Sequence, residues 1–165
     1  MKFRDAIAVL ICLLTLVGCA SYRPLYGKGP SGDGVAFYLS AVSVPEQHSR
    51  SAQLVRNELL NSLGSSAPRY VLKLVVIEKI LDVSTLSASG LHRKRFNLTA
   101  HYELAELSSG KSQVSGDSFS NVSFDTIRQP VADLQAADNA MSRAAQEVGQ
   151  DIHLRLAAYF ADRPN

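Results

Sequence analysis

Cysteine is nearly absent from this sequence: only Cys12 and Cys19 occur among its 165 residues. Both lie in the first 19 residues, so residues 20–165 contain no thiol. This absence excludes a disulfide, a thiol nucleophile, a cysteine zinc site and a redox centre from the chain after Cys19. A domain built from those residues must therefore be stabilised by core packing alone.

The sequence also lacks the patterns that catalysis and metal binding require. No His-x-x-x-His pair occurs among the four histidines, which are His48, His92, His101 and His153. There is no Gly-x-Ser-x-Gly nucleophile elbow, and the glycine-rich residues 27–34 are not followed by the lysine and helix of a phosphate loop. We therefore expect no enzyme activity, no cofactor and no metal site.

Neither sign of charge is in clear excess. Without residues 1–18, which resemble a secretory signal, the chain has 15 Lys and Arg residues and 14 Asp and Glu residues. Proteins that bind nucleic acid normally carry a strong basic excess, so this balance argues against a nucleic-acid partner. The remaining 147 residues fit a single domain.

A long hydrophobic run is missing as well, and the short one that is present is informative. Residues 6–17 are apolar except for Thr15, and Lys2 and Arg4 precede them. About 20 apolar residues are needed to span a bilayer, so a transmembrane anchor is disfavoured. A basic head followed by a short apolar segment is typical of a secretory signal.

The residues Leu16-Val17-Gly18-Cys19 resemble the lipobox of bacterial lipoproteins. The resemblance implies cleavage between Gly18 and Cys19, a diacylglycerol thioether on Cys19, and an acyl chain such as palmitate on the new N-terminus. The alternative is a cleaved signal without lipid. Several chains hold a protein on a membrane stably, whereas one does not. Ala20 replaces the aspartate that usually retains lipoproteins in the inner membrane, so we expect the cell outer membrane.

Three segments follow from this interpretation. Residues 1–18 form the removed signal peptide, residues 19–34 the lipidated N-terminus and tether, and residues 35–165 a single α/β domain that faces the periplasm. The tether is rich in Gly, Pro and Ser, which bury little apolar surface. The stretch Tyr22-Arg23-Pro24-Leu25-Tyr26 is too aromatic for a pure linker. We expect it to pack on the domain, on the bilayer interface or on a partner.

Hydrophobic periodicity predicts the element order β-α-β-β-β-α. The fold class that we expect is α+β, with two helices packed on one face of a four-stranded, mostly antiparallel sheet. The strand over 70–83 is apolar on both faces, which favours a central strand or a covered edge. The expected strands are 35–44, 70–83, 95–107 and 113–124, with a turn at 108–111 and a bulge near Gly116, and the expected helices are 51–64 and 130–160.

One group of polar residues suggests a binding site. Arg93, Lys94 and Arg95 follow one another near the start of the third long strand. Arginine offers a planar fork for phosphate and lysine a point charge, so these three are candidate contacts for a phosphorylated amphiphile. The alternative is that their charge keeps a strand end soluble and free of edge pairing.

The start of the mature chain carries a family resemblance. Cys19 followed by Tyr22-Arg23-Pro24-Leu25-Tyr26-Gly27 resembles the lipopolysaccharide-assembly lipoproteins of the LptE type, in their alphaproteobacterial form. Ala20-Ser21 stands where that pattern has a single glycine. Further segments are similar in order and character, namely residues 54–59, 70–74, 93–104 and 152–160.

The resemblance implies a two-helix, four-stranded fold and a role without catalysis. It implies an outer-membrane lipoprotein, on the periplasmic side or inside the lumen of the LptD-type β-barrel, that assists barrel assembly and the delivery of lipopolysaccharide to the outer leaflet. Arg93, Lys94 and Arg95 would then contact lipid A phosphates or acidic lumen residues. The alternatives are a structural subunit of another envelope assembly or transport complex, and a lipid-anchored hydrolase, which the lack of a nucleophile–base pattern disfavours.

Overall fold

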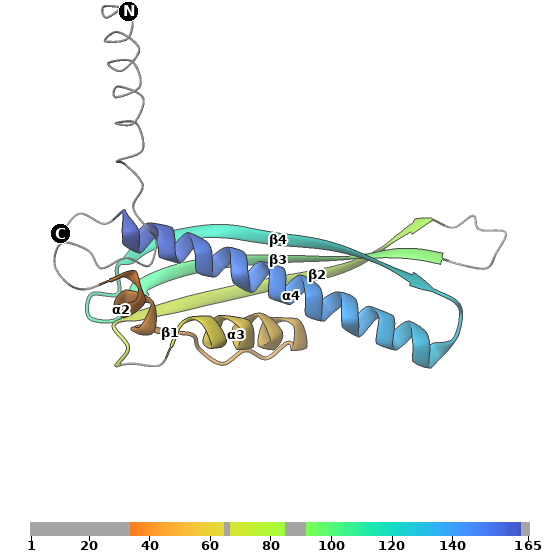
Figure 1. Ribbon diagram of the computed structural model, residues 1–165, viewed down its shortest axis with the longest axis horizontal. Coiled ribbons are helices and arrows are strands. Elements are labelled where there is room, and N and C mark those ends of the chain that lie inside the picture. The colour runs from red at the N-terminus through yellow and green to blue at the C-terminus, as the bar shows by residue number, and fades with distance from the viewer. Residues whose placement is uncertain (1–33, 65–66, 85–91, 163–165) are drawn as a thin grey trace, which may run out of the picture.

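The computed structural model describes residues 34–64, 67–84 and 92–162. A four-stranded sheet of order β1-β2-β3-β4 is covered on one face by helices (Figure 1). None of the helices in these ranges is long and apolar enough to cross a membrane. The elements are α2 (Val35–Ser40), β1 (Val42–Ser43), α3 (Arg50–Ser62), β2 (Tyr70–Ser84), β3 (His92–Glu106), β4 (Ser112–Thr126) and α4 (Pro130–Ala161).

The expected α+β class with a mostly antiparallel sheet is confirmed. Strands β2, β3 and β4 form an antiparallel meander, and β1 pairs parallel to the start of β2. The turn between β3 and β4 lies where it was expected: Gly110 has a φ of 67°, and the amide of Glu106 donates to the carbonyl of Lys111 at 3.0 Å. The antiparallel pairs follow from such short connections, while the parallel pair needs the crossover through α3.

The strand predicted over residues 35–44 is mostly wrong, because its first six residues form the short helix α2. A helix places Val35 and Leu39 on one side, and both are buried. Tyr38 stacks on Phe160 of α4, with 5.4 Å between the ring centroids. Packing against α4 thus overrides the loose alternation, and only the two residues of β1 remain as a strand.

The bulge expected near Gly116 is also misplaced. Gly116 stays in register with Tyr102, and the register shifts instead between Leu104 and Ala105 of β3. A Cβ atom on Gly116 would lie 2.8 Å from the Tyr102 hydroxyl. The glycine is therefore explained by the tyrosine ring that lies across it, and it marks no break in the strand.

Helix α3 lies within two residues of the range predicted for it, 51–64, and both of its ends are capped. The Ser49 hydroxyl accepts a hydrogen bond from the amide of Ala52 at 3.3 Å, which satisfies one free N–H group of the first turn. Leu63 follows the last helical residue, and Gly64 comes next with a φ of 55°, a left-handed conformation that suits glycine. The apolar stripe of this segment is buried throughout and consists of Ala52, Val55, Leu59 and Leu63.

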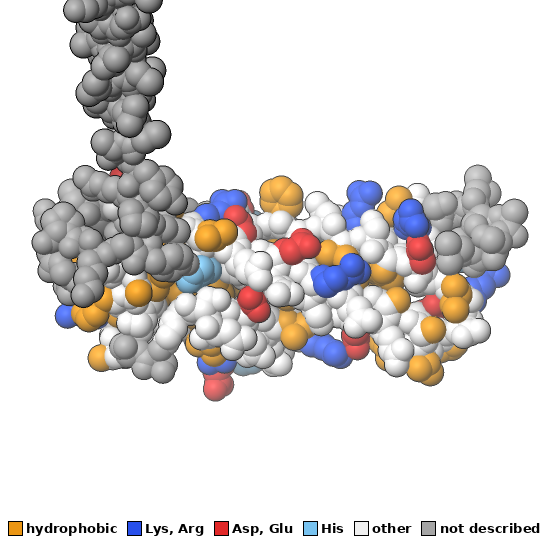
Figure 2. All heavy atoms as spheres, viewed as in Figure 1, with side chains coloured by type: hydrophobic (Ala, Val, Ile, Leu, Met, Phe, Trp, Pro, Cys, Tyr) orange, Lys and Arg blue, Asp and Glu red, His pale blue; other side chains and the backbone are white. Residues whose placement is uncertain are grey.

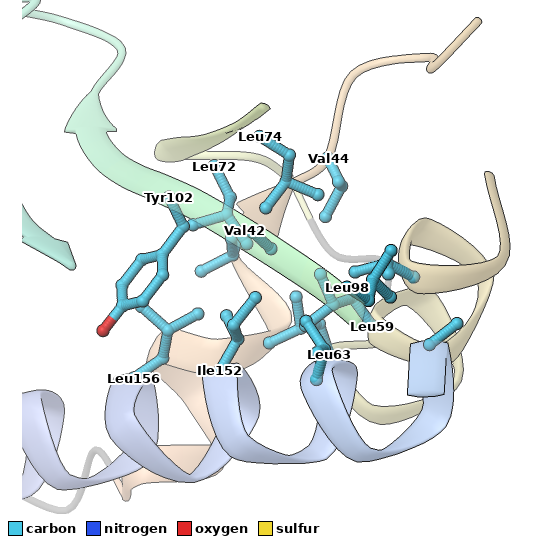
Figure 3. Packing of buried hydrophobic residues seen from close by; sticks show 14 of the residues in the cluster. Val42, Val44, Leu59, Leu63, Leu72, Leu74, Leu98, Tyr102, Ile152 and Leu156 are labelled. Atoms are coloured by element: carbon cyan, nitrogen blue, oxygen red, sulfur yellow. The ribbon is translucent and has the colours of Figure 1, made fainter. Parts of the chain in front are cut away.

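The core lies between the helices and one face of the sheet, called here the inner face (Figure 3). Leu72, Leu98 and Tyr102 point from the strands toward Ile152 and Leu156 of α4. Small residues let α4 approach the sheet closely, and those that are buried include Ala140, Ala144, Ala145 and Ala157. The first turns of α4 are less covered, since Leu134 is 64% exposed.

Strand β2 is flanked by strands on both sides only at its start. Only Tyr70 and Val71 pair with β1, so in the described part of the chain the rest of this edge has no strand beside it. The opposite face of the sheet, called here the outer face, carries no described helix. On that face, Val75 of β2 is 61% exposed. The apolar residues of β2 that were read as a second buried face therefore point to solvent.

The domain has two distinct ends (Figure 1). At the anchor end, α2 and the last turns of α4 lie together, and the described chain begins there at Gly34. At the far end, β2 finishes, β3 begins and α4 starts. A strand of 15 residues extends about 50 Å, so the two ends are separated by most of that length.

Candidate functional site

Arg93, Lys94 and Arg95 lie at the far end, at the start of β3. Because successive strand residues point to opposite faces, Arg93 and Arg95 project from the outer face and Lys94 from the inner face. The structure therefore splits the predicted cluster into two cations on one face and one on the other. The three do not converge on a single phosphate.

Two of these cations already have acidic partners. The Arg93 guanidinium donates two hydrogen bonds to Asp125 of β4, at 2.8 and 3.1 Å, and this pair raises the pKa of Arg93 and lowers that of Asp125. Lys94 lies 3.6 Å from a carboxylate oxygen of Asp82 on β2. Both pairs hold neighbouring strands together, as expected for charges that stabilise a strand end.

Arg95 differs from its neighbours, since it makes no ion pair within the described residues. It is exposed on the outer face between Leu81 of β2 and Ser123 of β4, its partners across the sheet. Leu81 is itself exposed. An unneutralised guanidinium beside an exposed leucine is an arrangement that can take an anionic group with an attached alkyl chain.

The outer face continues this mixed character toward the anchor end. Ile77, Thr99 and Phe119 are aligned across β2, β3 and β4. Phe119 is 70% exposed and Ile77 is 45% exposed. Two residues after Ile77 on β2, Lys79 is exposed beside Asn97 of β3. We name the set Ile77, Lys79, Leu81, Arg95 and Phe119 the amphipathic strip.

The strip was missed in the sequence, although a signal was present. Val114 and Phe119 fall on opposite faces of an alternating strand, and the predicted bulge near Gly116 rests on this difference. The strand alternates without interruption there, so Phe119 points to the outer face, while Val122 and Phe124 are buried on the inner face. An aromatic residue at an outward position of a serine-rich strand indicates a contact surface rather than an irregular strand.

The far end carries a second exposed apolar group. Ile127, Val131 and Leu134 are each at least half exposed and follow one another around the start of α4. Ile80 of β2 is also 53% exposed. In Figure 2 hydrophobic atoms gather at this end of the molecule, over the first turns of α4.

The serines of β4 have a packing role that sequence reasoning did not assign. Ser118 and Ser120 are buried on the inner face. The Ser118 hydroxyl donates to Asp151 of α4 at 2.7 Å, and Ser120 donates to Glu147 at 2.5 Å. Burial opposes ionisation of Asp151, but hydrogen bonds from Ser118 and Arg155 outweigh it and lower its pKa. Small hydroxyls therefore join α4 to β4 by polar contacts.

The described residues contain no arrangement of side chains that is typical of catalysis or metal binding. No group of three or more His, Cys, Asp and Glu side chains there can hold a metal ion. His101 pairs with Asp117 at 2.5 Å on the outer face, and no described nucleophile is hydrogen-bonded to the imidazole. Gly110 and Lys111 lie in the turn before β4 and Ser112 begins that strand, so a strand follows them in place of the helix of a phosphate loop.

Gly18 and Cys19, the predicted cleavage and lipidation site, lie outside the described residues. So does the tether that contains Tyr22–Tyr26. These predictions therefore stay as the sequence made them.

Comparison with known proteins identifies relatives by fold. No protein-family model matches the sequence, and no curated protein matches it either. A protein from Caulobacter crescentus CB15, provisionally described as a lipoprotein, has a similar structure, with a TM-score of 0.70 and 25% sequence identity. The similarity covers 82% of this chain and 100% of that one.

Two further solved structures share the fold at lower identity. A minor lipoprotein from Acinetobacter baumannii has a TM-score of 0.54 and 13% identity, over 71% of this chain and 88% of its own. Rare lipoprotein B from Shewanella oneidensis has a TM-score of 0.56 and 14% identity, over 74% of this chain and 96% of its own. Together with residues 16–19, these neighbours support the predicted class, a lipid-anchored protein of the cell envelope.

Proposed function

We propose that this lipoprotein acts at the outer membrane as the partner of the lipopolysaccharide-translocon β-barrel, the LptD type, where it assists barrel assembly and the delivery of lipopolysaccharide to the outer leaflet. It performs no catalysis. The observation that carries the proposal is the outer face of the sheet, which is amphipathic and which no described helix covers along three long strands. A surface of this kind, on a domain with no catalytic arrangement in its described part, suits a role in binding.

The partner is proposed from the sequence resemblance. The start of the mature chain resembles LptE-type lipoproteins, and the chain shares its fold with a solved lipoprotein, rare lipoprotein B. The domain length fits the same role. A strand of about 50 Å exceeds the roughly 30 Å hydrocarbon thickness of a bilayer, so a domain anchored at one leaflet is long enough to reach the other within a barrel lumen.

The amphipathic strip is the proposed contact for lipopolysaccharide. Arg95 would hold a lipid A phosphate, while Leu81 and Phe119 would lie against acyl chains. Arg93 and Lys94 would contribute less, since each is already neutralised by an aspartate. The strip would thus replace the three-cation cluster as the site of binding.

The test is affinity purification of the tagged full-length protein from detergent-solubilised outer membranes, followed by mass spectrometry. The expected result is one large β-barrel of the translocon type, recovered in near-equal amount. A Cys19→Ala variant, which cannot be lipidated, is the control for contact that depends on membrane anchoring. Recovery of subunits from another envelope complex, without the barrel, would overturn the proposal and favour that complex instead.

A further inference from the structure

Strand β4 forms one edge of the sheet (Figure 1). It pairs with β3 along one side, and in the described part of the chain no strand lies along its other side, called here the free edge. Helix α4 covers the inner face of β4, where two serines donate to it. The unpaired main-chain groups of an edge strand point along the plane of the sheet, so a helix on one face does not take the place of a neighbouring strand.

The free edge of β4 lacks the features that usually protect an edge. Proteins keep edge strands from pairing with other chains by means of lysine, proline or inward-pointing charges. Residues 112–126 contain no Lys, Arg or Pro, and their only charged side chains are Asp117 and Asp125. Both lie on the outer face and pair with basic side chains of β3, His101 and Arg93. Little charge is therefore left to repel a second strand.

The edge of β2 differs in this respect. Beyond Val71 it too has no neighbouring strand among the described residues. It carries exposed charges of both signs there, at Glu78, Lys79 and Asp82, as a protected edge does. Strand β4 is therefore the edge that is better suited to pairing with another chain.

We propose that β4 pairs antiparallel with β4 of a second copy of this chain, about a two-fold axis at Phe119. The two sheets of four strands would then form one continuous sheet, and the interface would be the same strand from each copy. The inference is independent of the proposed function, because it needs neither a barrel nor lipopolysaccharide.

The position of the axis follows from the rules of antiparallel pairing. Opposite residues of such a pair have their side chains on the same face of the sheet. An axis at residue 119 places each residue before it opposite the residue at the same distance after it, so outer-face residues meet outer-face residues. Phe119 is also the middle residue of β4, Ser112–Thr126, so this register uses the whole strand.

The outer-face pairs in this register are complementary. Phe119, which is 70% exposed, lies opposite its own copy and forms a cross-strand aromatic pair. Asp117 lies opposite Asn121, whose side-chain amide can donate to the carboxylate. Ser115 lies opposite Ser123, and both are exposed small polar residues. None of these pairs brings like charges together.

The inner-face pairs are small at the centre and apolar at the ends: Ser118 with Ser120, Gly116 with Val122, and Val114 with Phe124. A neighbouring register is worse. An axis at Asn121 would place Asp117 opposite Asp125, and like charges in that position destabilise a strand pair. An antiparallel ladder has about one hydrogen bond per residue pair, so the full register also forms the largest number of main-chain bonds.

The experiment uses the full-length lipidated protein, purified in detergent without other proteins. With residues 1–18 removed and Cys19 acylated, the chain has no free thiol, so Phe119→Cys introduces a single one. At the axis this thiol lies opposite its own copy, with Cα atoms about 4.5–5.5 Å apart, which is within the range of a disulfide. We expect a disulfide-linked dimer to form rapidly under mild oxidation.

The matched control is Ser123→Cys, a second exposed position on the same face of β4. In the proposed register it lies opposite Ser115, so its own copy is eight residues away, about 27 Å along the strand. Its dimer should therefore form several-fold more slowly than that of Phe119→Cys. Equal rates for the two variants would indicate random collision and would overturn the proposal.

A second measurement covers the case in which loss of the aromatic pair itself weakens the dimer. The single variants Ser115→Cys and Ser123→Cys both retain Phe119. When the two proteins are mixed, the mixed disulfide should form several-fold faster than either variant forms a disulfide with itself. A mixture that gives no excess of the mixed product would refute the register.

Discussion

Arg95 stands apart from Arg93 and Lys94, although the three are consecutive in sequence. Their side chains alternate between the faces of β3, and the acidic residues that neutralise two of them come from β2 and β4. Sequence alone identifies the cluster but not this pairing, because Asp125 is 32 residues away along the chain. The role of each cation is thus decided by cross-strand register.

This difference makes a prediction for lipopolysaccharide binding. Arg95→Ser is expected to weaken binding of the purified protein to lipopolysaccharide several-fold, because an unpaired guanidinium is lost. Arg93→Ser should have the smaller effect on binding, since its charge is already compensated by Asp125. Titration of both variants at fixed ionic strength checks this. Equal losses in the two variants would contradict the assignment to Arg95.

Ser118 gives a second prediction at this scale. Ser118→Ala removes a buried hydrogen bond to Asp151, so the free energy of unfolding should fall by about 1 kcal/mol. Urea denaturation measures this change. Ser123→Ala, an exposed serine on the outer face of the same strand, is the control and should leave the stability almost unchanged.

The same variant has a pH dependence with a defined sign. The pKa of Asp151 is lower in the folded protein than in the unfolded chain. Its contribution to stability is therefore present above the unfolded value of about 4 and is lost as the pH falls through the folded value. Ser118→Ala should raise the folded pKa and reduce this acid dependence. If the free energy of unfolding falls at low pH to the same extent in the variant, Ser118 does not set the pKa of Asp151.

At the scale of elements, helix packing depends on close approach. Helices α3 and α4 run in the same direction side by side, and Gly149 of α4 is buried where they meet. A Cβ atom on Gly149 would lie 2.7 Å from Cγ and 2.9 Å from Cβ of Glu58. The glycine thus provides space for the side chain of the neighbouring helix.

Gly149→Leu is accordingly predicted to separate the two helices. Overpacking of this kind typically costs about 1–3 kcal/mol, which thermal unfolding would reveal as a lower Tm. Gln146→Leu is the control, because it adds the same side chain at an exposed position of α4. Comparable Tm values for the two variants would mean that the helices have room to adjust.

Much of the fold was predictable because its elements follow local rules. The alternation of Phe96, Leu98 and Ala100 defines β3, and Ser49 marks the start of α3. The errors lie where tertiary packing decides. Residues 35–40 alternate weakly but become a helix against Phe160, and the exposed apolar residues of β2 resemble a buried strand because hydrophobicity does not reveal what covers a face.

At the scale of the whole molecule, the amphipathic strip makes a prediction for partner binding. Phe119→Ser removes the most exposed apolar residue of the strip, so recovery of the barrel in affinity purification should fall clearly. Because Phe119 points to solvent, the free energy of unfolding should change by no more than about 0.5 kcal/mol. Leu107→Ser is the control outside the strip, because Leu107 is half exposed directly after β3. Unchanged recovery with Phe119→Ser would remove the outer face as the contact surface.

The parallel pairing of β1 with β2 has a consequence for the order of folding. The meander of β2, β3 and β4 consists of strands that are neighbours in sequence, and such pairs form quickly. Strand β1 pairs with a strand that begins 27 residues after β1 ends, so this pair forms more slowly. The two residues of β1, synthesised before the meander, therefore find their partners in the sheet only after the meander has formed.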